Sequence, residues 1–174
     1  MEPFRLSLYD KNTILSFSLC FFLFLIAPGN LTQFNLTYFA PFLIVVIYKN
    51  SKLRSLGLAF STGLILDLFS TLPHFGLLSL NYTLTMAWIY NLQRHFFADS
   101  LTTLPIMTFL FCSISSAILA ALMFAIEGVN IVSKDWIAID LILMPLLDAA
   151  YAFTFFILPP FLISRLLKKR REPA

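Results

Sequence analysis

Three aspartates lie within long apolar segments, where a membrane-spanning helix ordinarily carries no charge: Asp67, Asp140 and Asp148. A carboxylate at membrane depth costs about 2.5–3.5 kcal/mol on insertion scales, so it normally faces protein, water or a partner. Such residues mark proton or cation pathways, but they also accept structural hydrogen bonds, cap broken helices or dock another subunit's helix. The sequence shows no internal repeat of the kind found in carriers. The pattern therefore favours a structural or docking role, with Asp140 and Asp148 as secondary candidates.

Asp67 shares one face of its predicted helix with small residues. Gly63 and Ala59 precede it at intervals of four residues, a spacing that lines one side of an α-helix. Small residues let two helix backbones approach closely. We therefore expect the carboxylate to point into a helix contact rather than into lipid. Two partners for it stay open: Asp140, predicted at a similar depth, and His74 in the adjacent turn.

A second group of small residues lies further along the chain. Ser113, Ala117 and Ala121 recur every four residues within one apolar segment. This spacing predicts close helix packing, either against another helix of the same chain, which is the preferred interpretation, or against an outside partner.

The sequence offers no arrangement suited to catalysis. Ser, Cys and His occur without a nucleophile–base spacing, and no glycine-rich phosphate loop is present. Cys20 and Cys112 lack the paired spacing of a disulfide or metal site, and we expect them to be small buried hydrophobic residues. His74 and His95 are predicted on opposite sides of a membrane. We therefore expect no enzyme activity, no cofactor and no metal.

Composition indicates an all-α integral membrane protein. The chain has 59% hydrophobic and 12% charged residues, whereas soluble domains average about 25% charged. Its net charge of +3 is modest and does not favour nucleic-acid binding. Breaks in hydropathy divide the chain into six apolar segments, which run approximately Asn12–Ala27, Leu36–Tyr48, Leu53–Ser70, Phe75–Tyr90, Leu101–Ile126 and Trp136–Leu162.

The second segment is shorter than the others. A full span needs about 20 residues, and Leu36–Tyr48 falls short of this and contains Pro41. We predict a short, kinked or partly re-entrant helix that its neighbours shield from lipid.

The basic residues predict the orientation. Short loops rich in Lys and Arg stay in the cytoplasm, and every Lys and Arg except Lys134 falls on one side of the six segments. This pattern places both termini in the cytoplasm and makes residues 163–174 a basic cytoplasmic tail. We expect residues 1–174 to form a single six-helix transmembrane domain.

The stretch from the second to the fourth segment resembles the MreD family of bacterial rod-shape-determining proteins. The resemblance lies in a short span with an outer-end proline, a basic loop, a glycine-containing span that ends in Gly-x-x-x-Asp-Leu-x-Ser, and a glycine that opens the next span. Thr71 departs from the family, which usually has Gly there, and the turn is one residue longer. The matching residues are Pro41, the loop Lys49 to Arg54, Gly57, Gly63, Asp67, Leu68, Ser70 and Gly76.

The resemblance implies a non-catalytic scaffold of the cell-wall elongation machinery, a multi-pass protein of the bacterial inner (cytoplasmic) membrane. Its partners would be the lipid bilayer, an MreC-like membrane protein and, directly or indirectly, the MreB filament, RodA and a penicillin-binding transpeptidase. The structural or docking residues would be Ala59, Gly63, Asp67, Ser70 and Gly76.

The family's six-helix fold is also similar to the substrate-binding subunits of energy-coupling-factor vitamin transporters. This similarity supplies an alternative function, in which Trp136 and Asn81 would line a small-molecule pocket.

Overall fold

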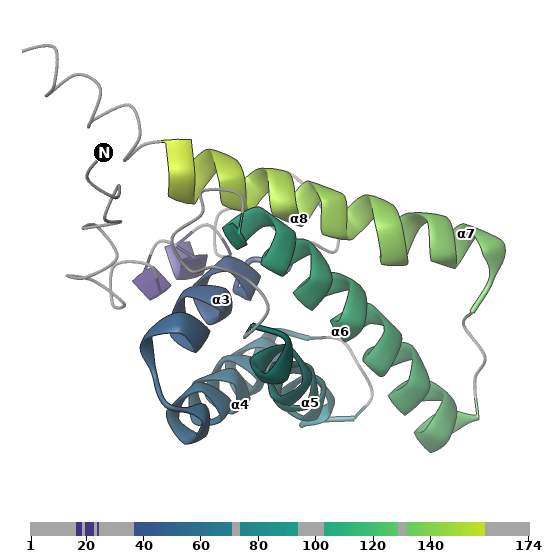
Figure 1. Cartoon of the computed structure of the whole chain (residues 1–174). Coiled ribbons are helices and arrows are strands. Elements are labelled where there is room, and N and C mark those ends of the chain that lie inside the picture. The colour runs from purple at the N-terminus through teal and green to yellow at the C-terminus, as the bar shows by residue number, and fades with distance from the viewer. Residues whose placement is uncertain are drawn as a thin grey trace, which may run out of the picture.

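A computed structural model describes residues 37–70, 74–93, 103–128 and 132–158, together with residues 17, 18, 20–22 and 24 of the first segment. Every element in this part of the chain is helical, as predicted (Figure 1). The elements are α3 (Ala40–Lys49), α4 (Lys52–Phe69), α5 (Leu77–Leu92), α6 (Thr103–Glu127), α7 (Lys134–Trp136), the π-helix η3 (Ile137–Leu143), α8 (Met144–Ala152) and the π-helix η4 (Phe153–Ile157).

Helix α3 is short and lies inside the molecule. Its sequence is apolar all round, which is the pattern of a buried helix, and all residues from Ala40 to Ile47 are buried. Pro41 stands in the first turn, where a helix tolerates a residue without an N–H. At 1.5 Å per residue its 10 residues span roughly half of a 30 Å hydrocarbon core. The prediction of a short, shielded second helix is confirmed.

Helices α4 and α5 form a hairpin. The turn between them ends at Gly76, which adopts the left-handed conformation with φ of 93° just before α5. Only glycine adopts this conformation without strain. Thr71, which stands where the MreD family usually has Gly, lies outside the described part of the chain.

The last two described helices are long and apolar. Thr103–Glu127 has 25 residues, and Lys134–Ile157, which joins α7, η3, α8 and η4, has 24. By length and composition, these two are the helices that qualify as membrane-spanning within the described residues. They pack together at α8 and diverge toward the loop that joins them (Figure 1).

The core surrounds α3, and large apolar side chains also cover the outside. One hydrophobic cluster includes five fully buried side chains from different elements: Phe39, Leu43, Met86, Met107 and Phe111. Outside the core, exposed large hydrophobic residues lie on α4, α5, α6, η3 and α8, among them Phe60, Leu68, Trp88, Phe124 and Leu146. Exposed apolar side chains that form a contiguous patch are typical of a surface that contacts a membrane or a protein partner.

The predicted segment bounds agree with the structure at three helices. The bounds of α4, α5 and α6 lie within two residues of the predictions. The described residues of the first segment are helical, but most of that segment, His95, the end of the sixth segment and the basic tail lie outside the described residues. Cys20 and Cys112 are both free and buried, as predicted.

Candidate functional site

Asp67 lies near the end of α4 and accepts hydrogen bonds from the start of α5. The N–H of Leu78 donates to Oδ1 at 3.0 Å, and the N–H of Ser79 donates to Oδ2 at 3.0 Å. The Ser79 hydroxyl donates to the same Oδ2 at 2.7 Å. These N–H groups belong to the first turn of α5, which lacks partners within its own helix. The carboxylate therefore caps a neighbouring helix at the positive end of its dipole.

The two helices touch at Gly63. A Cβ added to Gly63 would lie 2.8 Å from the backbone nitrogen of Ser79 and 2.9 Å from the carbonyl oxygen of Leu78. Ala59 is fully buried. Gly57, in contrast, has open space where its Cβ would stand. The small face of α4 thus packs against α5 of the same chain, and this contact brings the Asp67 carboxylate within reach of the α5 backbone.

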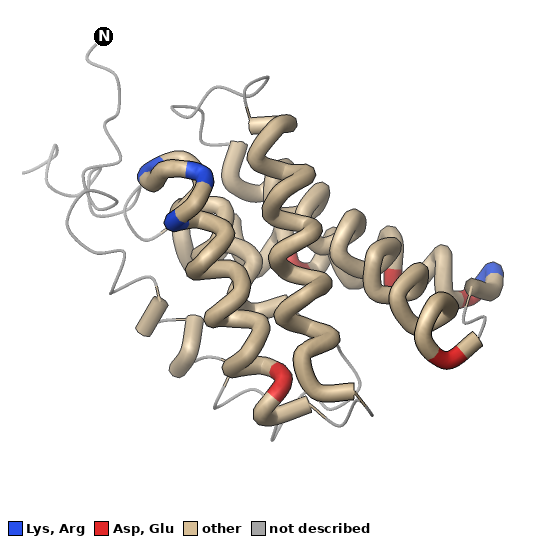
Figure 2. The backbone as a smooth tube through the Cα atoms, turned by 90° about the horizontal axis from the view of Figure 1, so that it is seen from below, with Lys and Arg blue, Asp and Glu red and all other residues tan. Residues whose placement is uncertain are grey.

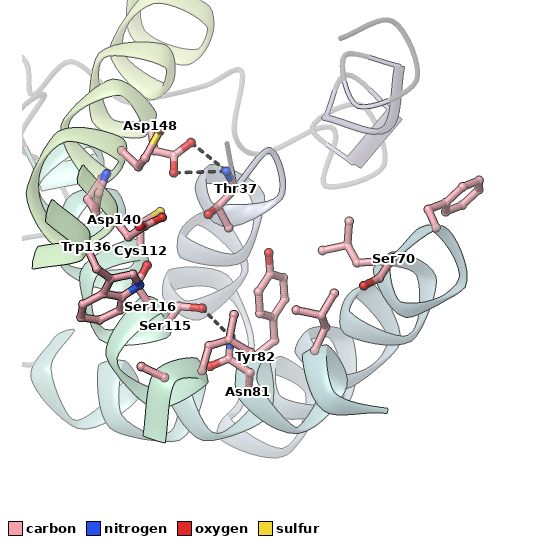
Figure 3. Close-up of a pocket in the computed structure, with 17 residues that line it drawn as sticks. Thr37, Ser70, Asn81, Tyr82, Cys112, Ser115, Ser116, Trp136, Asp140 and Asp148 are labelled. Atoms are coloured by element: carbon pink, nitrogen blue, oxygen red, sulfur yellow. Dashed lines mark hydrogen bonds between the residues drawn. The ribbon is translucent and has the colours of Figure 1, made fainter. Parts of the chain in front are cut away.

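A second polar region is a cavity of about 510 Å³ between α4, α5, α6 and the C-terminal helix (Figure 3). Thr37, which precedes α3, completes its wall. Both polar and apolar side chains line it. The polar and aromatic lining residues are Thr37, Ser70, Asn81, Tyr82, Cys112, Ser115, Ser116, Trp136, Asp140 and Asp148.

Asp148 is the most buried acidic residue that the structure describes, at 1% exposed. The N–H of Thr37 donates to both of its carboxylate oxygens, at 2.9 and 3.2 Å (Figure 3). The Cys112 thiol and the Thr37 hydroxyl also hydrogen-bond to it. All of these partners are neutral, so Asp148 joins the C-terminal helix to the segment before α3 without a cation beside it.

Asp140 lines the same cavity from the π-helix η3. A π-helix bonds residue i to i+5 and therefore turns less per residue than an α-helix. Asp140 and Asp148 stand eight residues apart, which would place them about 80° apart around a regular α-helix. The π-helical turns after Asp140 reduce that angular offset, and both carboxylates face one cavity.

Asn81 and Tyr82 reach the cavity from α5. The Asn81 side-chain N–H donates to the Ser115 hydroxyl of α6 at 2.8 Å. Tyr82 is 5% exposed, and its ring contacts Phe111 edge-on. Its hydroxyl points into the cavity (Figure 3).

The structure separates residues that the sequence had brought together. Asp67 accepts hydrogen bonds from α5, whereas Asp140 lines the cavity, so the alternative in which these two carboxylates meet is wrong. The positions of Asp67 and Asp140 along their helices predict the depth of each residue, but not the direction in which its side chain points. His74 does not pair with Asp67 either, because its Nε2 lies 3.3 Å from Oε1 of Glu127.

The small residues of α6 were predicted to pack either within the chain or against an outside partner, and the structure treats them differently. Ser113 packs internally and donates a hydrogen bond to the Leu141 carbonyl oxygen at 3.1 Å. Ala117 and Ala121 are exposed, because α6 and the C-terminal helix diverge there (Figure 1). The face thus begins as an internal contact and ends open. Ser70 lines the cavity, and Gly76 forms the turn before α5.

Sequence reasoning named Trp136 and Asn81 for a pocket but missed Thr37, Tyr82, Ser115 and Ser116. Polar residues within apolar segments were the available signal. No group of three His, Cys, Asp or Glu residues that could hold a metal occurs in the described ranges. The cavity can donate and accept hydrogen bonds and present negative charge. Comparison with protein-family models, curated proteins and solved structures finds no match to this chain.

Proposed function

We propose that the chain is a non-catalytic, six-span scaffold of the bacterial cell-wall elongation machinery in the inner membrane. Its partners are an MreC-like membrane protein and, directly or through it, MreB, RodA and a penicillin-binding transpeptidase. The observation that carries the proposal is the position of the residues that resemble the MreD family. Gly63 lies at the α4–α5 contact, Asp67 caps α5 and Gly76 shapes the turn.

These residues hold α4 and α5 together as a hairpin. The acceptor oxygens of Asp67 are engaged by α5, and the Gly63 backbone meets the α5 backbone directly. A scaffold needs such a fixed shape, because a partner binds a rigid surface at a lower entropic cost.

Charge supports the proposed orientation. Lys49, Lys52 and Arg54 gather at the α3–α4 turn, and Asp67 stands at the other end of α4 (Figure 2). The His74–Glu127 pair joins the α4–α5 turn to the end of α6, and both residues belong to the side that the sequence predicts to be outside. The basic turn on the cytoplasmic side follows the positive-inside rule.

The test is depletion and co-purification in the native cells. Depletion should make the cells lose their rod shape, and tagged protein extracted in mild detergent should carry an MreC-like protein. Gly57→Leu is a matched variant for both experiments, because the open space at Gly57 lets the folded protein accept the larger side chain. Normal cell shape after depletion, with no elongation protein recovered, would contradict the scaffold function.

A second candidate function is a substrate-binding subunit of a small-molecule transporter. The specific observation in its favour is that Trp136 and Asn81 line one cavity of about 510 Å³, within the roughly 300–1,000 Å³ range of ligand pockets. Recovery of a transport ATPase partner instead of elongation proteins would favour this function.

A further inference from the structure

The cavity presents charge of one sign only. Two carboxylates, Asp140 and Asp148, line it, and no Lys, Arg or His is among its lining residues. Carboxylates accept hydrogen bonds and offer none, whereas an ammonium group offers three donors and no acceptor. The wall is therefore complementary to a cation and repels an anion.

Asp148 places one of these carboxylates at the buried end of the cavity. It is 1% exposed, and its hydrogen-bond partners are the neutral groups of Thr37 and Cys112. A buried carboxylate is costly unless it is paired with a cation or neutralised. Lys49, Lys52, Arg54 and Lys134, the basic residues in the described part of the chain, do not line the cavity. A cation would therefore have to come from outside these residues.

Tyr82 supplies an independent observation. Its hydroxyl is aimed into the cavity, and its side chain is 5% exposed (Figure 3). The hydroxyl opens onto the cavity, where its oxygen can accept a hydrogen bond from an N–H group of a bound molecule and its O–H can donate to water.

The remaining wall is apolar and aromatic. Leu66, Phe69, Leu119 and Met144 face the cavity, and the Trp136 ring lies at its edge beside Asp140 (Figure 3). An indole ring attracts a nearby cation through its negative face and also packs against apolar carbon. The occupant should thus combine a cationic group with an apolar body.

We infer that the cavity binds an amphipathic amine, with its ammonium group between Asp140 and Asp148 and its apolar part against Trp136. The site extends the second candidate function by naming a ligand class, and it does not depend on the scaffold role. The same ammonium chemistry occurs in a soluble amine and in the headgroup of phosphatidylethanolamine.

The two tryptophans of the chain allow a direct measurement. Trp88 is 68% exposed and lies outside the cavity, so Trp88→Phe leaves Trp136 as the sole fluorescent tryptophan. Phenethylamine is titrated into this full-length variant in detergent, and 2-phenylethanol, which lacks the charge, is titrated in parallel. The amine should change Trp136 emission saturably and bind at least tenfold more tightly than the alcohol.

Substitutions locate the ammonium group. Asp140→Asn and Asp148→Asn should each weaken phenethylamine binding at least tenfold and leave 2-phenylethanol unchanged. Asp135→Asn is the matched control, because Asp135 precedes Trp136 but does not line the cavity. Its affinity should equal that of the parent. Asp140 is only partly buried, so its substitution keeps the test valid if Asp148→Asn fails to fold.

Lipid composition then separates the two sources. Nanodiscs of phosphatidylglycerol alone are compared with nanodiscs that also contain phosphatidylethanolamine. Competition between phosphatidylethanolamine and phenethylamine for Trp136 identifies the lipid headgroup, and its absence identifies a soluble amine. Equal binding of amine and alcohol, no saturable response to either, or equal affinities of the Asp140→Asn and Asp135→Asn variants would each overturn the inference, whatever the cell-shape experiment shows.

Discussion

The α4–α5 hairpin and the cavity beside it each bury an aspartate, but the two carboxylates are satisfied differently. Asp67 is 7% exposed and accepts three hydrogen bonds, all from the first turn of one helix. Asp148 is 1% exposed, and its partners are the Thr37 N–H, which both oxygens share, and the neutral side chains of Thr37 and Cys112. Both carboxylates hold elements of the fold together, but only Asp148 also lines the cavity.

The difference shows how burial alone misleads about function. Both aspartates occur in apolar sequence, where each looks equally costly. The origin of their donors distinguishes them, because a carboxylate that caps a helix terminus has a structural reason to exist. Around Asp148, in contrast, the cavity combines a carboxylate acceptor, free volume and the Tyr82 hydroxyl.

The largest effect should come from Gly63→Leu. Its side chain would enter the backbone of α5 at Leu78 and Ser79, where even a Cβ has no room. Overpacking a core costs about 1–3 kcal/mol or more, and a backbone obstacle cannot rotate away. We expect a large fall in the apparent melting temperature of the detergent-solubilised protein.

Gly57→Leu is the control for this experiment. It makes the same change in the same helix, but nothing lies within 4 Å of the added Cβ. Replacing a helical glycine should stabilise the helix by up to about 1 kcal/mol. Equal losses from the two variants would show that the hairpin does not depend on close approach at Gly63.

Asp67→Leu should rank second. It removes every acceptor from the N–H groups of Leu78 and Ser79 and from the Ser79 hydroxyl, and each buried unsatisfied group costs about 1–3 kcal/mol. Asp67→Asn should be intermediate. The amide keeps one acceptor oxygen, but its N–H groups would face donor groups of α5 and could not bond to them. Ser79→Ala, which removes one donor only, should be mildest. Thermal unfolding of the three variants tests this order, and an Asn variant as stable as the parent would refute it.

The sequence predicted the hairpin better than the cavity, for physical reasons. The four-residue spacing of Ala59, Gly63 and Asp67 describes one helix face, and the contact lies between helices adjacent in sequence. The bond from Thr37 to Asp148 joins residues 111 positions apart, and no local pattern encodes such a pairing. The π-helical turns at Asp140 also bring it closer in angle to Asp148 than an α-helical period predicts.

Gly76→Ala should have a smaller effect than Asp67→Leu. The left-handed conformation at Gly76 costs a residue with a Cβ about 1–2 kcal/mol, although the Cβ itself would meet open space. The loss should therefore reflect backbone strain in the hairpin turn alone. Gly57→Ala, at a helical glycine with equally open space, is the matched control and should not destabilise. Equal stability of Gly76→Ala and the parent would show that the turn can relax without disturbing the capping by Asp67.

The smallest effect should come from the ion pair that links the two regions, His74 and Glu127. It joins the hairpin turn to the end of α6, but the His74 side chain is 47% exposed, and the pair is fully charged only while His74 is protonated. Exposed ion pairs contribute about 0–1 kcal/mol. A double-mutant cycle with His74→Gln and Glu127→Gln should therefore give a coupling energy below about 1 kcal/mol. The cycle is measured by thermal unfolding at low and high salt, and the coupling should weaken as salt screens the charges. A coupling as large as the loss in Asp67→Leu would mean that the cavity side is held to the hairpin by charge, and that the two regions do not differ as their aspartates indicate.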